Sequence, residues 1–207
     1  MKIGVIILAA GGSRRINGEP KQSLRFQGKT LLRRVAETAL RTNFPTIVVL
    51  GANREKLRGE IEDLPLEIAF NQNWESGMSS SIKIGLAALS EKADAAIFML
   101  CDQPLVTTET LRRLQNAFIE TKKLIAACEY EETIGVPALF AREIFAELNA
   151  LRNDEGAKKI IIRDLNRIVA VAAPEAAFDV DTVRDYEKLK ELNQSNGERI
   201  SDFKFGD

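Results

Sequence analysis

Residues 3–22 read IGVIILAAGGSRRINGEPKQ, an apolar run that leads directly into a glycine-rich turn. Such a run fits a strand buried on both faces, and in a parallel sheet the turn after it lies at the carboxyl edge, where ligands bind. Gly11 and Gly12 carry no side chains, so an anion can approach the backbone N–H groups there. The stretch predicts an α/β protein with a candidate phosphate site, and a turn that binds nothing is the alternative.

Further apolar runs rich in Ile, Val, Leu and Ala follow, at 46–50, 66–70, 95–100, 124–128 and 168–172. Segments with helical spacing lie between them. The alternation predicts a three-layer α/β sandwich, in which helices flank a mostly parallel sheet. We expect a single domain over residues 1–192.

Residues 193–207 have no sustained apolar periodicity. We expect them to form a flexible C-terminal tail. A small docking strand at Phe203 and Phe205 is the alternative.

The composition excludes several classes of function. The 29 basic and 30 acidic residues leave a net charge of -1, which gives no electrostatic basis for binding a nucleic acid or an anionic membrane. The chain has no histidine, which excludes Ser-His-Asp hydrolysis and the usual zinc sites. Cys101 and Cys128 lie in apolar runs, so we expect buried free thiols and a cytoplasmic location. The apolar stretch at the start is too short for a signal peptide.

Acidic side chains follow a strand-like run and precede a helix-like segment. Asp102 comes just after the run 95–100, where a carboxylate needs a cation or hydrogen-bond donors, although capping the turn at Pro104 is an alternative role. Asp179 and Asp181 point to one face if their segment is extended, whereas helix capping would use only one of them. Two such carboxylates beside a phosphate site would hold Mg²⁺ and promote phosphoryl or nucleotidyl transfer.

The loop of residues 71–81 opens onto a helix and ends in three serines. Serines at a helix start usually cap it, but free N–H and hydroxyl groups there can also contact a nucleotide. Trp74 is expected in the core, the usual place of a lone tryptophan.

Together these segments resemble the molybdenum cofactor cytidylyltransferase family, a group of nucleotidyltransferases. The family's start motif, L-A-A-G-x-S-x-R-M-G-x-P-K-Q, is matched by residues 8–22, with Ile16 in place of Met and one residue inserted before Gly18. Its N-x-x-W-x-x-G-M-S-S-S, C-D-Q-P and D-x-D-T motifs follow in order at 71–81, 101–104 and 179–182. The resemblance extends to about Leu192 and implies a nucleotide-diphospho-sugar-transferase-like, Rossmann-like fold.

By this resemblance, Arg15, Lys21 and Asp102 are catalytic, and Asp102 and Asp181 bind Mg²⁺, with Asp179 as the alternative ligand. The implied nucleotide-binding residues are Leu8, Ala9, Ala10, Gly11, Gly12, Ser13, Arg14, Arg15, Lys21, Asn71, Gly77, Ser79 and Asp102. Asn71, Gly77 and Ser79 would lie on the base and ribose side. An LAAG start goes with CTP and LAGG with GTP, so Ala10 implies CTP.

The implied acceptor half departs from the family pattern. Val136 stands where the family usually has a histidine, and Lys158 where it has an arginine, which exchanges a bidentate group for a point charge. The implied acceptor-binding residues are Gly135, Pro137, Asp154, Gly156 and Lys158.

The expected reaction transfers CMP from CTP to the phosphate of molybdopterin and releases pyrophosphate. A transient contact with a recipient molybdoenzyme belongs to this expectation. Alternatives are CTP- or GTP-dependent transfer to another phosphorylated small molecule, and a non-catalytic chaperone that delivers the cofactor to a molybdoenzyme.

Overall fold

The computed structural model describes residues 1–12, 16, 18–89 and 93–201, with side chains described up to residue 192. Seven strands form one sheet in the order β5-β4-β1-β6-β8-β7-β9. The strands are β1 Ile3–Ala9, β4 Thr46–Leu50, β5 Glu67–Phe70, β6 Ala95–Leu100, β7 Ile125–Tyr130, β8 Thr133–Ala141 and β9 Ile168–Ala172. Only β8 runs against its neighbours, so the predicted mostly parallel sheet is confirmed.

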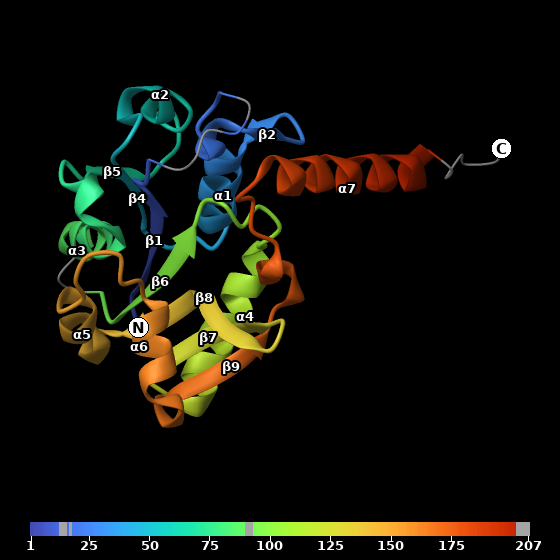
Figure 1. The fold of residues 1–207 in the computed structure, drawn as a ribbon. Coiled ribbons are helices and arrows are strands. Elements are labelled where there is room, and N and C mark those ends of the chain that lie inside the picture. The colour runs from blue at the N-terminus through green and yellow to red at the C-terminus, as the bar shows by residue number, and fades with distance from the viewer. Residues whose placement is uncertain (13–15, 17, 90–92, 202–207) are drawn as a thin grey trace.

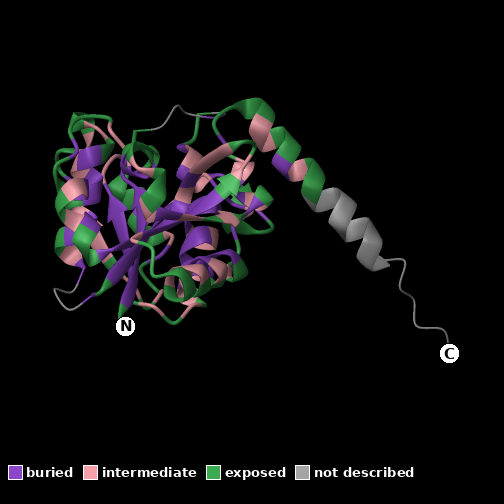
Figure 2. Ribbon diagram, turned by 90° about the horizontal axis from the view of Figure 1, so that it is seen from below, coloured by how far each residue is buried: buried purple, intermediate pink, exposed green. Residues whose placement is uncertain are grey.

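Strand β1 lies in the middle of the parallel part of the sheet, and all seven of its residues are buried. In register, Val5 faces Thr46 of β4 on one side and Ile97 of β6 on the other. Figure 2 shows the central strands as the buried layer of the molecule. The carboxyl ends of β1, β4 and β6 therefore meet at one edge of the sheet.

Helices cover both faces of the sheet (Figure 1). The buried residues of α1 Leu31–Leu40, α2 Arg54–Gly59 and α4 Thr108–Thr121 pack on one face. Those of α3 Met78–Ala88, α5 Phe145–Asn149 and α6 Lys158–Arg163 pack on the other. This arrangement confirms the three-layer sandwich.

Short elements connect these layers. They are the hairpin of β2 Arg25–Phe26 with β3 Lys29–Thr30, and the 3-10 helices η1 Lys21–Ser23, η2 Trp74–Ser76, η3 Arg142–Ile144, η4 Leu165–Arg167 and η5 Pro174–Ala177.

The last helix, α7 Val183–Ser201, leads away from the body of the protein (Figure 1). Its first turns are attached, because Leu189 is buried with Leu24 and Phe26, and the Tyr186 hydroxyl donates to the Arg25 carbonyl at 2.9 Å. The helix continues through Ser201, where the sequence predicts a tail from residue 193. A helix that is already nucleated extends at low cost through a segment without proline. Phe203 and Phe205 lie outside the described residues, and the flexibility of the tail stays a prediction.

Helix α3 approaches β1 closely at Gly85. A Cβ atom added there would lie 2.4 Å from Ile6 Cγ2 and 3.3 Å from Val49 Cγ2. Both neighbours are β-branched and stiff, so we expect the clash in Gly85→Ala to lower the free energy of unfolding by about 1–3 kcal/mol. The better helix propensity of alanine offsets up to about 1 kcal/mol of this loss. Urea denaturation measures this.

The matched control is Gly59→Ala in helix α2, where an added Cβ meets nothing within 4 Å. We expect that variant to be as stable as the wild type or more stable, because alanine favours a helix over glycine. Equal stability of Gly85→Ala and Gly59→Ala would contradict the close packing of α3 on β1.

Candidate active site

Two adjoining pockets lie at the carboxyl edge of the sheet. The outer pocket, about 930 Å³, follows β4 and β5 and is lined by Gly12, Gly51, Ala52, Asn53, Arg54, Glu55, Lys56, Asn71, Gln72 and Trp74. The inner pocket, about 380 Å³, follows β1 and β6 and is lined by residues 8–12 together with Lys21, Gln22, Trp74, Glu75, Gly77, Met78, Ser81, Leu100, Cys101, Asp102 and Asp154. Because Gly12 and Trp74 line both, the two pockets form one continuous candidate site.

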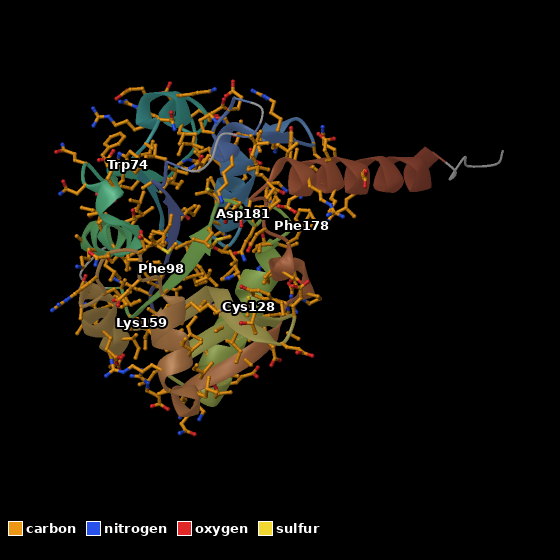
Figure 3. The ribbon with its side chains drawn as sticks, in the orientation of Figure 1. Trp74, Phe98, Cys128, Lys159, Phe178 and Asp181 are labelled. Carbon is orange, nitrogen blue, oxygen red and sulfur yellow. The ribbon has the colours of Figure 1, made fainter. Side chains whose placement is uncertain are left out.

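Trp74 forms the wall between the two pockets. A Cβ atom on Gly12 would lie 2.7 Å from the indole ring, and one on Gly51 would lie 2.7 Å from Trp74 Cβ. The side chain also packs against the buried residues on the α3 face of the sheet (Figure 3). Trp74 is thus half-buried against the core rather than within it, and it also faces the site.

The glycine-rich turn is held by its carbonyl groups. The Ala10 carbonyl accepts a hydrogen bond from the backbone N–H of Ala52 at 2.9 Å. The Gly11 carbonyl accepts one from Gln22 Nε2, also at 2.9 Å, and the Gln22 side chain is buried. These bonds hold the turn at the edge of the inner pocket. Three predicted site residues, Ser13, Arg14 and Arg15, lie outside the described residues.

Lys21 lies between two of the predicted metal ligands. Its Nζ donates to Asp102 Oδ2 at 2.6 Å and to Asp181 Oδ1 at 2.8 Å. The side chains of Lys21 and Asp102 are 15% and 16% exposed, whereas Asp181 is 64% exposed. Burial alone lowers the pKa of Lys21, but the attraction of Asp102 and the hydrogen bonds to both carboxylates outweigh it, so the pKa is raised above its usual value. The ammonium group therefore stays charged.

Backbone contacts bring the two acidic segments together, although they are far apart in the chain. The N–H of Val180 donates to the Asp102 carbonyl at 2.9 Å, which places Asp179 and Asp181 beside the end of β6. Buried Gln103 donates to the Ala176 carbonyl at 2.8 Å and fixes the approach of the same segment. The predicted meeting of Asp102 with Asp181 is present in the structure.

The acidic residues suit a metal that also binds substrate oxygens. Asp102 Oδ1 is buried and has no hydrogen-bond partner among the described residues, so it is an unsatisfied acceptor that a cation would suit. Within the part of the chain that the structure describes, no three acidic or cysteine side chains form a complete metal cage. Mg²⁺ does not need one, because it usually takes one or two carboxylates together with phosphate oxygens.

Asn71 organises the connection from β5 to α3. Its Nδ2 donates to Ser80 Oγ at 2.7 Å and to Ser81 Oγ at 2.9 Å, and its Oδ1 accepts from the Asn73 N–H at 2.9 Å. The N-cap of α3 is Gly77 rather than a serine. Asn71 lines the outer pocket and Ser81 the inner one, while predicted Ser79 lines neither.

The connection between α5 and α6 packs on the start of α3. The Ser79 N–H donates to the Asn153 carbonyl at 3.0 Å. Gly77 has φ +100°, and a Cβ there would lie 2.4 Å from the Asn153 oxygen, so only glycine fits. This contact brings Asp154 to the inner pocket and Gly156 against Met78 Sδ.

The structure separates the implied acceptor residues. Asp154 lines the inner pocket, but Gly135 and Pro137 lie within β8 and line neither pocket. The Val136 carbonyl between them accepts from Gln103 Nε2 at 3.2 Å. Lys158 is exposed at the start of α6 and also lines neither pocket.

Sequence reasoning did not identify the β4–α2 connection, residues 51–56, as part of the site. It lines much of the outer pocket, and Lys56 pairs with Glu19 next to the glycine-rich turn. The available signal was its place directly after a strand predicted to be parallel, because ligands bind at that edge of such sheets.

Comparison with known proteins defines the family. Residues 5–170 match the model of the MobA-like NTP transferase domain. The chain belongs to this family. It is therefore a nucleotidyltransferase, and the resemblance seen in the sequence is confirmed at the family level. No helix among the described residues has the length and apolarity needed to cross a membrane.

Several proteins are similar to this MobA-like domain. Nicotine blue oxidoreductase of Paenarthrobacter nicotinovorans is 36% identical over 110 residues, which are 53% of each chain. Purine catabolism protein PucB of Bacillus subtilis is 26% identical over 89% of this chain and 94% of that protein. Bifunctional protein GlmU of Xanthobacter autotrophicus is 32% identical over 74% of this chain and 35% of that protein. This chain thus spans about half of the oxidoreductase and about a third of GlmU.

Solved structures agree with the fold. The crystal structure of Rv0371c from Mycobacterium tuberculosis superposes with a TM-score of 0.79 and 31% identity, covering 92% of this chain and 98% of that one. A manganese complex of the same protein has a TM-score of 0.76, with 30% identity over 92% of this chain and 99% of that one. Molybdopterin-guanine dinucleotide biosynthesis protein A from Archaeoglobus fulgidus, at 20% identity and a TM-score of 0.66, covers 93% of this chain and 99% of its own and supports the fold alone.

The acidic cluster predicts a pH dependence of stability. Asp179 is exposed, but desolvation of its carboxyl group by neighbouring protein atoms, and then repulsion by Asp102 and Asp181, raise its pKa to about 6, above the value of about 3.9 in an unfolded chain. The folded state then binds more protons, so this residue's contribution to stability falls as pH rises from about 4 to about 6. We expect Asp179→Asn to raise Tm by roughly 2–4 °C at pH 7.5 and by less at pH 4.5. The expected rise at pH 7.5 is kept small because solvent partly screens the charge of Asp179.

The control is Asp185→Asn, measured by the same thermal melts without metal. Hydrogen bonds from Thr182 lower the pKa of Asp185, so its carboxylate stabilises the fold above about pH 4 and that stabilisation is lost as the pH falls. This variant should lower Tm at pH 7.5, the opposite sign. An equal gain for Asp179→Asn at both pH values would show that Asp179 titrates normally.

Proposed function

We propose that the chain transfers CMP from CTP to the phosphate of molybdopterin, releasing pyrophosphate and forming the cytosine dinucleotide of the cofactor. The observation that carries this proposal is the meeting of the glycine-rich turn, Lys21 and Asp102 in the inner pocket, with Asp181 on the same ammonium. Backbone N–H groups and a cation suit a triphosphate, and carboxylates suit a divalent metal.

The two pockets divide the nucleotide between them in this proposal. The triphosphate lies in the inner pocket against Gly11, Gly12 and Lys21, where small residues leave room for phosphate oxygens. The base and ribose lie in the outer pocket, beside Trp74 and Asn71. The indole supplies an apolar wall and the pocket's amide groups supply polar contacts, the usual combination in a nucleotide site. Ala10 favours CTP through the family resemblance.

Asp102 and Asp181 are the proposed ligands of Mg²⁺, with Asp179 as the alternative. The unpartnered Oδ1 of Asp102 supports this assignment. When bound, Mg²⁺ supplies positive charge to the phosphate oxygens. The backbone N–H groups and the charges of Arg15 and Lys21 stabilise negative charge that moves onto the leaving pyrophosphate.

The reaction needs positioning rather than a protein nucleophile. An oxygen of the acceptor phosphate forms the new bond to the α-phosphorus, and the bond from that phosphorus to the β-phosphate bridging oxygen breaks. The acceptor phosphate is already ionised, so no general base has to remove a proton. A chain without histidine can therefore promote this reaction.

A different phosphorylated acceptor is the second candidate. Val136 and Lys158 replace residues of the family's acceptor motifs, and Gly135, Pro137 and Lys158 line neither pocket. GTP in place of CTP and a non-catalytic cofactor chaperone are the remaining alternatives. A transient contact with a recipient molybdoenzyme follows from the proposed product.

The cysteines support a cytoplasmic location in this proposal. Cys101 and Cys128 are free and buried, which suits the reducing cytoplasm.

The test of the function is a competition assay with purified protein, molybdopterin, Mg²⁺ and equal concentrations of CTP and GTP. We expect the cytosine dinucleotide as the main product by mass spectrometry, with a preference of about 10 to 1000-fold, because pocket shape and a few hydrogen bonds discriminate the bases incompletely. A preference for GTP would refute the cytidylyl assignment. Turnover with another phosphorylated acceptor but not with molybdopterin would favour the second candidate, and nucleotide binding without turnover would favour the chaperone.

The test of the carboxylate is Asp102→Asn, which keeps the shape of the side chain and removes its charge. We expect the turnover rate to fall by about 100-fold or more, because a metal ion contributes several kcal/mol to transition-state stabilisation. Asp63→Asn is the control, since Asp63 pairs with Arg33 on the surface. A near-normal rate for Asp102→Asn at saturating Mg²⁺ would exclude Asp102 as a metal ligand, provided that thermal melting shows a folded protein.

A further inference from the structure

The ammonium group of Lys21 occupies the position between the two proposed metal ligands. It donates to Asp102 at 2.6 Å and to Asp181 at 2.8 Å, and its side chain is largely buried. Lys21 is thus the counter-ion of both carboxylates in the structure. A lysine side chain is a compact charge on a flexible four-carbon stem, so it can leave this position without moving the backbone.

A divalent cation held by the same carboxylates would lie next to this ammonium. Asp102 and Asp181 each use one carboxylate oxygen to accept a hydrogen bond from Lys21. The other oxygen of Asp102, Oδ1, is buried and belongs to the same carboxyl group. Like charges at such short range repel strongly in a partly buried site. The metal and the ammonium therefore oppose each other, even where they use different oxygens.

The inner pocket offers Lys21 a second partner. Lys21 lines this pocket together with Gly11 and Gly12, where the triphosphate is proposed to lie. An ammonium group has three N–H donors, and a phosphate group accepts charge-assisted hydrogen bonds as a carboxylate does. A bound triphosphate would attract the ammonium away from the carboxylates and leave both of them to the metal.

We propose that Lys21 acts as a resident cation that competes with the divalent metal for Asp102 and Asp181, and that the triphosphate of the nucleotide releases it. The free enzyme then binds metal weakly, and metal and nucleotide bind cooperatively. This inference rests on the proposed metal and nucleotide sites. The rival role, in which Lys21 only orients the two carboxylates for the metal, predicts the opposite sign: removal of the ammonium would then weaken metal binding or leave it unchanged.

The experiment measures Mn²⁺ binding to the full chain without nucleotide, by electron paramagnetic resonance and calorimetry. We expect Lys21→Gln to lower the Kd for Mn²⁺ by about tenfold or more relative to the wild type, because an opposing charge is removed. Lys29→Gln is the matched control, since it removes the same charge from a lysine paired with Glu37 and should change the Kd by less than about twofold. Lys21→Arg keeps the charge and should bind Mn²⁺ no more tightly than the wild type.

The location of the metal is tested by adding Asp181→Asn to Lys21→Gln, which should remove the gain in affinity. Unchanged or weaker binding by Lys21→Gln, or equal tightening by Lys21→Arg, would overturn the competition while leaving the metal site in place. If neither the wild type nor Lys21→Gln binds Mn²⁺, with or without CTP, the proposed metal site itself fails, and the inference fails with it.

A measurement on the wild type does not depend on the folding of any variant. In a crystal structure with CTP and Mn²⁺, Lys21 Nζ should lie beyond about 4 Å, the usual limit of an ion pair, from both carboxylates and should contact the triphosphate. Lys21 still bridging Asp102 and Asp181 in that complex would overturn the proposal.

Discussion

Strand β1 pairs in parallel with β4 on one side and with β6 on the other, and the rest of the molecule depends on this pairing. Because parallel strands end at the same edge, three connections that are far apart in the sequence meet there. These are the glycine-rich turn after β1, the 51–56 connection after β4 and Asp102 after β6. A sheet with β1 at its edge would leave one of these connections without its neighbours.

The two helical layers contribute differently to the site at this edge of the sheet. The layer of α1, α2 and α4 covers one face of the sheet with large apolar side chains. The layer of α3, α5 and α6 also shapes the site, because α3 starts at the pocket edge and the connection between α5 and α6 rests on that start. The contact of Gly77 with Asn153 therefore links the nucleotide side of the site to the segment that carries Asp154. Displacement of either segment would alter both.

Much of the fold is predictable from the sequence because the central strands β1, β4 and β6 are buried on both faces and have continuous apolar runs. The outer strands β5 and β9 are only partly buried, contrary to the expectation from their apolar runs. The structure places β1, β4, β5, β6, β7 and β9 within about two residues of their expected bounds. Strand β8 is missed because Gly135 and Pro137 interrupt its apolar run, and both residue types are unusual within a sheet. Helices α2 and α6 have only six residues each, too few for a clear helical period in the sequence.

The candidate site is predictable in part, because its motifs mark individual segments but not their contacts. The acidic pair was expected from strand-end carboxylates, whereas the bridge from Lys21 depends on residues that are 81 and 160 positions away in the chain. No local pattern records such a contact. One side of the outer pocket, residues 51–56, is not predicted because these residues have no motif, although they follow a predicted strand. Ser79 and Ser81 differ only in their position on a helix, and the structure decides which of them faces the pocket.

The place of Trp74 gives the protein an internal optical reporter. It is the only tryptophan in the sequence, and its indole lies in the wall shared by the outer and inner pockets. Indole emission responds to the polarity and stacking of the groups that contact the ring. A ligand in either pocket therefore changes the ultraviolet fluorescence of Trp74. Occupancy of the site is therefore measurable in the unlabelled, unmodified protein, with excitation that selects the indole over the two tyrosines.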